Sequence, residues 1–407
     1  MKTRLSNLFT STRRESPADE ESRNADLLIR AGYIDKLMAG VYSQLPLGLE
    51  VLRNIEKIIR EEMASVGGQE VLMPSLQPKE NWLKTGRWDT VDILYKVKDA
   101  SDREFALGPT HEEVVVPLMQ QFAQSYKAFP TSVYQIQTKF RMELRPKAGL
   151  LRGREFQMKD MYSFHLDAED FSAYYEKVKG AYQRIFERVG IGEKTLETFA
   201  SGGDFSQYSH EYQTITSSGE DTIYICESCN IAINKEIIAD AKNVCAQCGS
   251  TKLQEARSIE VGNIFELKTK FTEAFNYSVT NDQGNNVPVL MGCYGIGLTR
   301  LMGTVVEVLS DDAGIVWPKE LAPAPVVIVE LKDGLGQKLF DALPSALYDD
   351  RKVSAGVKFA DADLMGLPYR AVVSEKTNER GVVEIKNRTT GEVTEKTFDG
   401  AVSLLSS

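Results

Sequence analysis

The residues that point most directly to chemistry lie in residues 140–156 (FRMELRPKAGLLRGREF), within a chain whose formal net charge is -10. The cations are Arg141, Arg145, Lys147, Arg152 and Arg154, and they are accompanied by Glu143 and Phe156. Arginine forks bind phosphate oxygens in a bidentate manner. A glutamate can accept from an exocyclic amino group, and a phenylalanine ring can stack on a base. The segment therefore predicts a nucleoside triphosphate site built on a β-hairpin rather than on a P-loop. The alternative is a solvated basic turn beside a salt-bridged strand.

Another arginine, Arg300, falls in the first turn of a predicted helix that follows the glycine-rich segment GCYGIG at 292–297. Glycines allow a ligand to approach the backbone closely. The N-terminus of a helix also favours anions. Arg300 is therefore a candidate for a second phosphate contact, although a turn of this kind more often serves packing alone.

The cysteines predict a metal site. Four of the five form two Cys-x-x-Cys pairs separated by 15 residues, and they are Cys226, Cys229, Cys245 and Cys248. This spacing is typical of a structural zinc site. The alternatives are a redox dithiol and knuckles that hold no metal. The fifth, Cys293, is expected to form part of a pocket wall rather than to act as a nucleophile.

Composition limits the class of protein. The chain has 407 residues, of which 42% are hydrophobic and 26% charged, and this predicts two or three globular domains. No apolar run is long enough to span a bilayer, so no membrane partner is expected. The first 14 residues are basic, but no apolar core or cleavage site follows, and they are interpreted as mature sequence. The acidic balance restricts any nucleic-acid contact to local basic patches. Cysteines in metal-type pairs favour a reducing, cytoplasmic location.

The hydrophobic pattern predicts the elements that position these groups. Residues 21–39 and 48–66 are predicted helices, and a strand follows that ends at Pro74. Thr110 is a candidate helix N-cap, with Glu113 three residues later in the position of a capping box. Residues 132–144 and 154–165 alternate in polarity and predict two antiparallel strands that flank the basic turn. Helices are expected at 167–189, after Gly297, and at 335–347.

Several motifs resemble those of a known enzyme class. FRME followed by RGREF resembles motif 2 of the class II aminoacyl-tRNA synthetases, and GIGLTR resembles motif 3, with Thr299 where an acid is usual. GLEVLRNIEKIIREEMASVGGQEVLMP resembles motif 1, a dimer-forming helix and strand. GPTHEE, FRMELRP, REFQMKDMYSFH, SHEY and MGCYGIG closely resemble the bacterial and organellar prolyl-tRNA synthetases, in the same order along nearly the whole chain.

The resemblance implies roles for matched positions. The implied catalytic residues are Arg141, Arg152 and Arg300. The implied ATP-binding residues are Arg141 at the α-phosphate, Glu143 at the adenine amino group, Arg152 at the γ-phosphate, Phe156 stacked on adenine, and Arg300. The implied proline-binding residues are Thr110, Glu112, Arg141, His165, His210 and Cys293. The implied tRNA-binding residues are Arg145, Lys147, Lys358 and Phe359. For any single histidine, a satisfied core or surface position is the alternative.

The resemblance also implies an α+β fold. It comprises a class II antiparallel sheet flanked by helices, a small zinc-knuckle insertion, and a C-terminal mixed α/β anticodon-binding domain. The expected domains are 1–222 and 256–320 (catalytic), 223–255 (knuckle) and 324–407 (anticodon-binding). Two positions depart from the family: Asn263 stands where a histidine is usual, and VSA at 353–355 replaces a charged, proline-containing segment.

The implied activity is ATP-dependent activation of proline and its transfer to tRNA(Pro) by a cytoplasmic homodimer. ATP with Mg²⁺ and structural Zn²⁺ would be the cofactors. The large editing domain of many bacterial relatives is not expected here, so mischarged alanine would be cleared by a separate protein or tolerated. The alternatives are a paralogue with another amino-acid or carrier specificity, and a non-catalytic RNA-binding paralogue.

Overall fold

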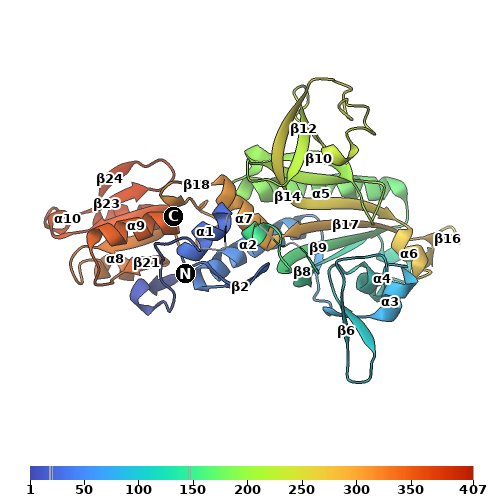
Figure 1. Cartoon of the computed structure of the whole chain (residues 1–407), viewed down its shortest axis with the longest axis horizontal. Helices are drawn as coiled ribbons and strands as arrows, with labels where there is room; N and C mark the ends of the chain where they lie inside the picture. The colour runs from blue at the N-terminus through green and yellow to red at the C-terminus, as the bar shows by residue number, and fades with distance from the viewer. Residues whose placement is uncertain (18–19, 21, 145, 147, 407) are drawn as a thin grey trace.

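A computed structural model describes residues 1–407 except 18, 19, 21, 145, 147 and 407 (Figure 1). Within the described residues, nine strands form one large sheet in the order β11-β10-β13-β12-β14-β17-β9-β8-β4. The strands are β4 (Gln69–Glu70), β8 (Thr131–Phe140), β9 (Glu155–His165), β10 (Thr195–Ser201), β11 (Tyr208–Ile215), β12 (Asp221–Cys226), β13 (Ala232–Asn234), β14 (Leu253–Lys268) and β17 (Leu290–Gly297). The pairings are antiparallel except β10–β13 and β4–β8. The predicted antiparallel sheet is therefore present.

Helices cover one face of this sheet. They are α1 (Arg23–Arg30), α2 (Pro46–Ser65), α5 (Ala168–Arg188) and α7 (Leu298–Val308). The apolar stripe of α2, which includes Leu52, Ile55 and Ile59, is buried in a core shared with Met161 of β9 and Tyr294 of β17. Figure 1 shows the long helix α5 running beside β14 and β17. We call this side the helix-covered face.

The opposite side carries Phe156 and Cys293, which the sequence analysis singled out, together with several buried polar residues. In the β8–β9 ladder, Lys139 lies opposite Phe156, Gln135 opposite Asp160, and Val133 opposite Tyr162. In the β9–β17 ladder, Tyr162 lies opposite Cys293. Side chains of directly paired residues share a face, so these residues define a second side, the site face. The residues between them, such as Met161 and Tyr294, point to the helix-covered face.

Smaller elements border the site face. They are β5 (Leu76–Pro78), β6 (Tyr95–Lys98), β7 (Glu104–Leu107), α3 (Lys79–Lys84), α4 (Glu112–Phe122), α6 (Lys270–Ala274), β15 (Ser278–Thr280) and β16 (Asn286–Pro288). β5, β7 and β6 form a small sheet next to α3 and α4. Val115, Val116 and Met119 of α4 pack with Tyr162 and Phe164 in a second core. This core holds the turn before α4 against the large sheet.

The C-terminal unit lies at one end of the molecule in Figure 1. Its sheet has the order β1-β21-β20-β22-β23-β24 within the described residues. Its elements are β1 (Lys2–Arg4), β20 (Val326–Glu330), α8 (Gln337–Ala342), β21 (Ala346–Asp349), α9 (Ala355–Met365), β22 (Tyr369–Val373), α10 (Glu375–Glu379), β23 (Val382–Asn387), β24 (Val393–Thr397) and α11 (Phe398–Ser406). The edge strand β1 comes from the other end of the chain and pairs in parallel with β21.

Two predicted helices were too long. The helix expected at 21–39 ends at Arg30, and a hairpin follows, formed by β2 (Ile34–Met38) and β3 (Val41–Gln44). Gly32 and Gly40 have positive φ angles, of 75° and 76°. Glycine adopts this conformation easily and it ends helices. The helix expected at 335–347 is limited to α8, since residues 346–349 form β21.

A last short hairpin pairs β18 (Ser310–Asp311) with β19 (Gly314–Ile315). In the described part of the chain, we find no helix whose length and apolarity would let it cross a membrane.

Candidate functional site

The predicted phosphate-binding arginines line one cavity of about 230 Å³. Arg141 and Arg152 come from the β8–β9 hairpin, and Arg300 comes from the first turn of α7. Glu143 and Glu260 also line this cavity. Three guanidinium groups from two distant segments therefore face one space, as expected for a polyphosphate site.

Arg141 carries a positive charge that the described protein groups leave available for a ligand. Its guanidinium carbon lies 5.2 Å from the centre of the Phe156 ring. Its buried Nε has no hydrogen-bond partner among the described residues. Burial, followed by the nearby charge of Arg300, lowers the pKa of Arg141, but an arginine still remains charged near neutral pH. A partly buried cation with an unused donor is suited to an incoming anion.

Arg300 and Arg152 are held by carbonyl and carboxylate oxygens. Arg300 donates from Nε to the Leu151 carbonyl at 2.8 Å, and from Nη1 to the Glu260 carbonyl at 3.1 Å and Oε2 at 3.3 Å. Arg152 donates from Nε to Glu143 Oε2 at 3.1 Å and from Nη1 to Glu220 Oε2 at 3.3 Å. Glu260 was missed in the sequence analysis, because a single carboxylate in a β-strand gives no distinctive pattern.

A second cluster surrounds Glu112, which is fully buried at the start of α4. Thr110 donates from Oγ1 to Glu112 Oε2 at 2.6 Å, and Cys293 donates from Sγ to Glu112 Oε1 at 3.3 Å. Burial and the neighbouring Glu112 raise the pKa of the Cys293 thiol well above its usual value. Cys293 is therefore a thiol donor rather than a thiolate nucleophile.

The predicted capping box at Thr110 is wrong. His111 occupies the N-cap position of α4, and no side chain of the described residues caps it. The hydroxyl of Thr110 instead donates to the Glu112 carboxylate. Glu113 turns away and accepts from Thr85 and Arg87, each at 2.9 Å.

Arg87 is a further buried group that the sequence analysis missed. It lies 2.9 Å from the Glu113 carboxylate and 3.7 Å from that of Glu112. Its guanidinium carbon is 4.8–5.3 Å from the ring centres of Trp82, Phe205 and Phe271. Arg87 therefore pairs mainly with Glu113, whereas the Glu112 carboxylate accepts from Thr110 and Cys293.

Two histidines predicted at the proline site lie elsewhere. His165 points to the helix-covered face, where its Nδ1 is 2.5 Å from Asp170 Oδ2 of α5. His210 also reaches that face, with its Nδ1 2.9 Å from the hydroxyl of Tyr175. Successive side chains of a strand point to opposite faces, so His165, three residues after Tyr162, lies on the face opposite to Tyr162. His210 is paired with Ile264, and Ile264 is paired with Tyr294, so all three share the helix-covered face.

The four residues predicted to contact tRNA are Arg145, Lys147, Lys358 and Phe359. Arg145 and Lys147 lie outside the described residues. Lys358 is buried, and its Nζ donates to the carbonyls of Glu330 and Asp349, each at 2.9 Å. The expected phosphate contact of Lys358 therefore does not fit the structure, because its ammonium group is used inside the domain. The partly buried Phe359 ring lies 4.7 Å from the guanidinium carbon of Arg370.

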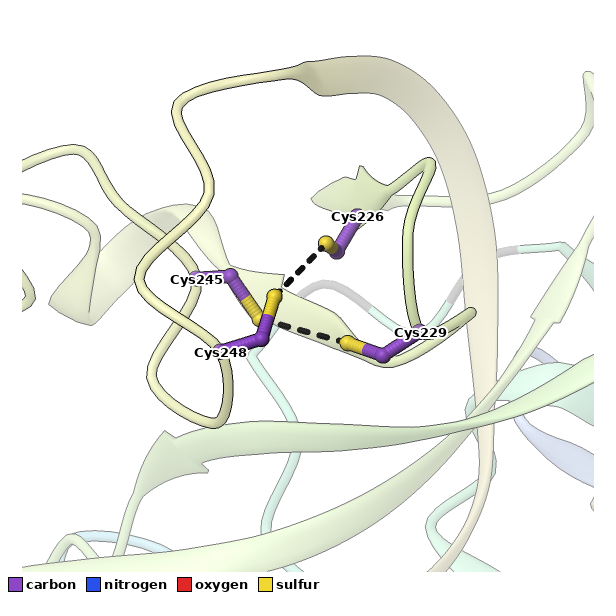
Figure 2. A group of neighbouring side chains, drawn as sticks. All are labelled: Cys226, Cys229, Cys245 and Cys248. Carbon is purple, nitrogen blue, oxygen red and sulfur yellow. Dashed lines mark hydrogen bonds between the residues drawn. The ribbon is translucent and has the colours of Figure 1, made fainter.

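The four paired cysteines converge between the end of β12, at Cys226, and the start of β14, at Leu253 (Figure 2). Their Sγ atoms all lie within 4.8 Å of one another. The Cys226–Cys248 and Cys229–Cys245 separations are 3.6 and 3.4 Å. Tetrahedral zinc with Zn–S bonds of about 2.3 Å requires sulfur atoms about 3.8 Å apart. Both the donor set and its spacing therefore fit zinc.

Comparisons with known proteins agree with these features. Residues 95–309 match the family described as "tRNA synthetase class II core domain (G, H, P, S and T)", and residues 324–407 match "Anticodon binding domain". The chain is 39% identical to a protein of Wolbachia sp. subsp. Drosophila simulans named Proline--tRNA ligase, covering 98% of this chain and 99% of that protein. It is 40% identical to a protein of the same name from Anaplasma phagocytophilum, covering 99% and 100%.

A solved structure shares the fold. It is the prolyl-tRNA synthetase of Cryptosporidium parvum in complex with L-proline and AMP. The TM-score is 0.76 at 15% sequence identity, and the match covers 94% of this chain and 73% of that one. The predicted class II architecture with a C-terminal anticodon-binding domain is confirmed.

Proposed function

Because the chain belongs to the class II aminoacyl-tRNA synthetases and, within them, to the proline--tRNA ligases, we propose that two neighbouring clusters on the site face divide its reaction between them. The reaction is ATP-dependent activation of proline followed by transfer to tRNA(Pro). The cluster of Arg141, Arg152 and Arg300 binds ATP, and the cluster around Glu112 binds proline. Arg141 lies within electrostatic range of both clusters, since its pKa is lowered by burial and by the charge of Arg300 and raised by that of Glu112. The observation that carries the assignment is that Arg141, Arg152 and Arg300 line one cavity.

In the first step, an oxygen of the proline carboxylate forms a bond to the α-phosphorus of ATP, and the bond to pyrophosphate breaks. Arg141 and Arg300 stabilise the negative charge that develops at the α-phosphate. Phe156 stacks on adenine, Glu143 accepts from its amino group, and Arg152 binds the γ-phosphate. No strong base is needed, because the carboxylate is already a nucleophile and positioning supplies most of the rate.

Glu112 and Thr110 bind the secondary ammonium group of proline. The ammonium pairs with the Glu112 carboxylate, and Cys293 lines the wall. In the second step, the 3′-terminal hydroxyl of tRNA attacks the prolyl carbonyl and AMP leaves. Arg145 and Lys147 are proposed to contact phosphates of the acceptor end, on their charge alone. Phe359 stays a candidate for an anticodon base contact.

We assign Mg²⁺ to the carboxylates that line the arginine cavity, which include Glu220, Asp221 and Glu260. Oxygen donors of this kind suit Mg²⁺. Bound there, Mg²⁺ would supply charge neutralisation for the phosphates of ATP. The four cysteines hold a structural zinc, which ties the loops after β12 and before β14 together.

We also propose the division into domains at 1–222, 223–255, 256–320 and 324–407, with the last supported by the family match at 324–407. The enzyme is a homodimer through the motif 1 segment. It works in the cytoplasm, where reduced thiols are maintained. Alanine attached to tRNA(Pro) is cleared by a separate editing protein or tolerated.

The test is pyrophosphate exchange with each of the twenty amino acids. We expect exchange that depends on proline far more than on threonine, serine or glycine. Exchange with a different amino acid would reassign the specificity. No exchange with any of them, in zinc-loaded folded protein, would favour a non-catalytic paralogue.

A further inference from the structure

A buried polar network lies beneath the Thr110–Glu112 turn, on the site face. Its members are His111, Gln135, Lys139, Asp160 and Tyr162, and each is at most 2% exposed. Lys139 Nζ lies 2.8 Å from Asp160 Oδ1 and 2.8 Å from His111 Nδ1. The backbone N–H of His111 donates to the Tyr162 hydroxyl at 3.0 Å, and that hydroxyl donates to Asp160 Oδ2 at 2.9 Å. Both the ring and the backbone of His111 are therefore held by β8 and β9.

Lys139 fixes the tautomer of His111. An ammonium group only donates hydrogen bonds, so Nδ1 must accept and the ring hydrogen must lie on Nε2. That Nε2–H donates to the Pro74 carbonyl at 3.1 Å. Burial, together with the adjacent Lys139, lowers the pKa of His111 to about 4, so the ring is neutral at working pH. A neutral histidine with one defined hydrogen makes a directional link.

The segment that ends at Pro74 is held by the same strand. Met73 donates its backbone N–H to Gln135 Oε1 at 2.9 Å, and its carbonyl accepts from Gln137 Nε2. Gln135 in turn donates to Asp160 Oδ2 at 3.0 Å. Three side chains thus hold Met73 and Pro74 by hydrogen bonds: Gln135 and Gln137 of β8 bind Met73, and His111 binds Pro74.

We propose that His111 is a positioning residue for proline binding, which the Lys139–Asp160 pair orients so that it fixes the Thr110–Glu112 turn against Met73 and Pro74. The proposal rests on the proposed function. His111 itself does not touch the amino acid; it acts through its two chain neighbours. Buried ion pairs contribute little net stability compared with apolar groups of similar volume. A charged pair kept fully buried beside a neutral histidine is better explained by the geometry that it imposes on the turn.

Two substitutions test separately the two hydrogen bonds of the His111 ring, one to Lys139 and one to the Pro74 carbonyl. In His111→Asn, the side-chain oxygen replaces Nδ1 as the acceptor for Lys139, but the donor to Pro74 is lost. In His111→Gln, the amide nitrogen replaces Nε2 as the donor to Pro74. In pyrophosphate exchange, we expect His111→Asn to raise the proline KM at least tenfold and the ATP KM less than twofold. We expect His111→Gln to recover most of this loss.

The matched control is His165→Asn, which changes the buried histidine on the opposite face of the sheet and should alter the proline KM less than twofold. Equal rises in the proline and ATP KM values for His111→Asn, or a proline KM within twofold of wild type, would overturn the proposal. If His111→Asn does not fold, Gln137→Met removes another tie to Met73, and the same two KM outcomes decide. Absence of proline-dependent exchange in the wild type would instead overturn the proposed function.

Discussion

Replacing Glu112 by glutamine tests the proline site most directly. The amide keeps the size of the side chain and an oxygen that accepts from Thr110, and of the two hydrogen bonds to the carboxylate only the weak one from Cys293 is lost. Arg87 keeps its closer partner Glu113 at 2.9 Å, so no buried cation loses its partner. What disappears is the negative charge offered to the secondary ammonium of proline.

The size of the effect follows from the burial of Glu112. Its side chain has no exposed surface, so a bound ammonium interacts with it out of contact with bulk water. Hydrogen bonds to charged groups contribute about 1.5–3 kcal/mol, and truncation of one partner of a buried charge pair costs about 2–5 kcal/mol. A loss of about 3 kcal/mol corresponds to a rise in the proline KM of roughly 150-fold. ATP does not meet this carboxylate, so its KM should change less than threefold, a limit that allows for about 0.6 kcal/mol of indirect coupling.

The assay is proline-dependent pyrophosphate exchange, with the proline KM measured at saturating ATP and the ATP KM at saturating proline. Glu113→Gln is the matched control, because it removes an equally buried charge one residue away whose partners are Thr85 and Arg87. It should lower the melting temperature while raising the proline KM by less than a tenth of the factor seen for Glu112→Gln. Equal effects of both substitutions, or equal rises in the two KM values for Glu112→Gln, would show that Glu112 is a structural residue.

Three further outcomes are expected. Arg141→Ala should lower the activation rate by about 100-fold or more, as for loss of one preorganised donor. Lysine should restore only part of it, because a point charge does not replace a fork; near-normal exchange by either variant would remove Arg141 from the site. Elemental analysis should find about one zinc per chain, and Cys226→Ser should lower the melting temperature more than the exchange rate. Protein produced with zinc available that contained none would contradict the site. The enzyme should form some alanyl-adenylate, because missing methylenes give only about 1–3 kcal/mol of discrimination. It should not deacylate alanyl-tRNA(Pro), and hydrolysis above the spontaneous rate would reveal an editing site.

The sequence predicts the convergence of Arg141, Arg152 and Arg300 well, because these residues are close together in the chain or lie on elements with a regular period. The alternation in 132–144 and 154–165 predicted β8 and β9 to within about four residues, and Arg141 and Arg152, which follow β8 and precede β9, line one cavity. Arg300 could be added because a glycine-rich strand end leads directly into its helix. Local patterns of this kind report which elements form and which face of each is polar.

Arg87 shows what such patterns cannot give. It lies in a loop after α3, 26 residues before Glu113 in the chain. The two residues meet only because α3 and α4 pack together. No period relates the two residues, so the charge balance beside Glu112 becomes visible only in three dimensions. The same holds for Glu260 and Arg300, which come from β14 and α7.

The errors at His165 and Lys358 have a different origin, because the signal was present in the sequence. With Phe156 assigned to the polar side of its strand, even-numbered residues of that strand share its face, so His165 should point away. In α9, the buried residues Ala362 and Met365 lie four and seven positions after Lys358, which places Lys358 on the same helical stripe. Its ammonium group is therefore enclosed, and it satisfies two carbonyls at the ends of β20 and β21. The family resemblance implied a role for both residues, but periodicity decides whether a side chain can reach the ligand.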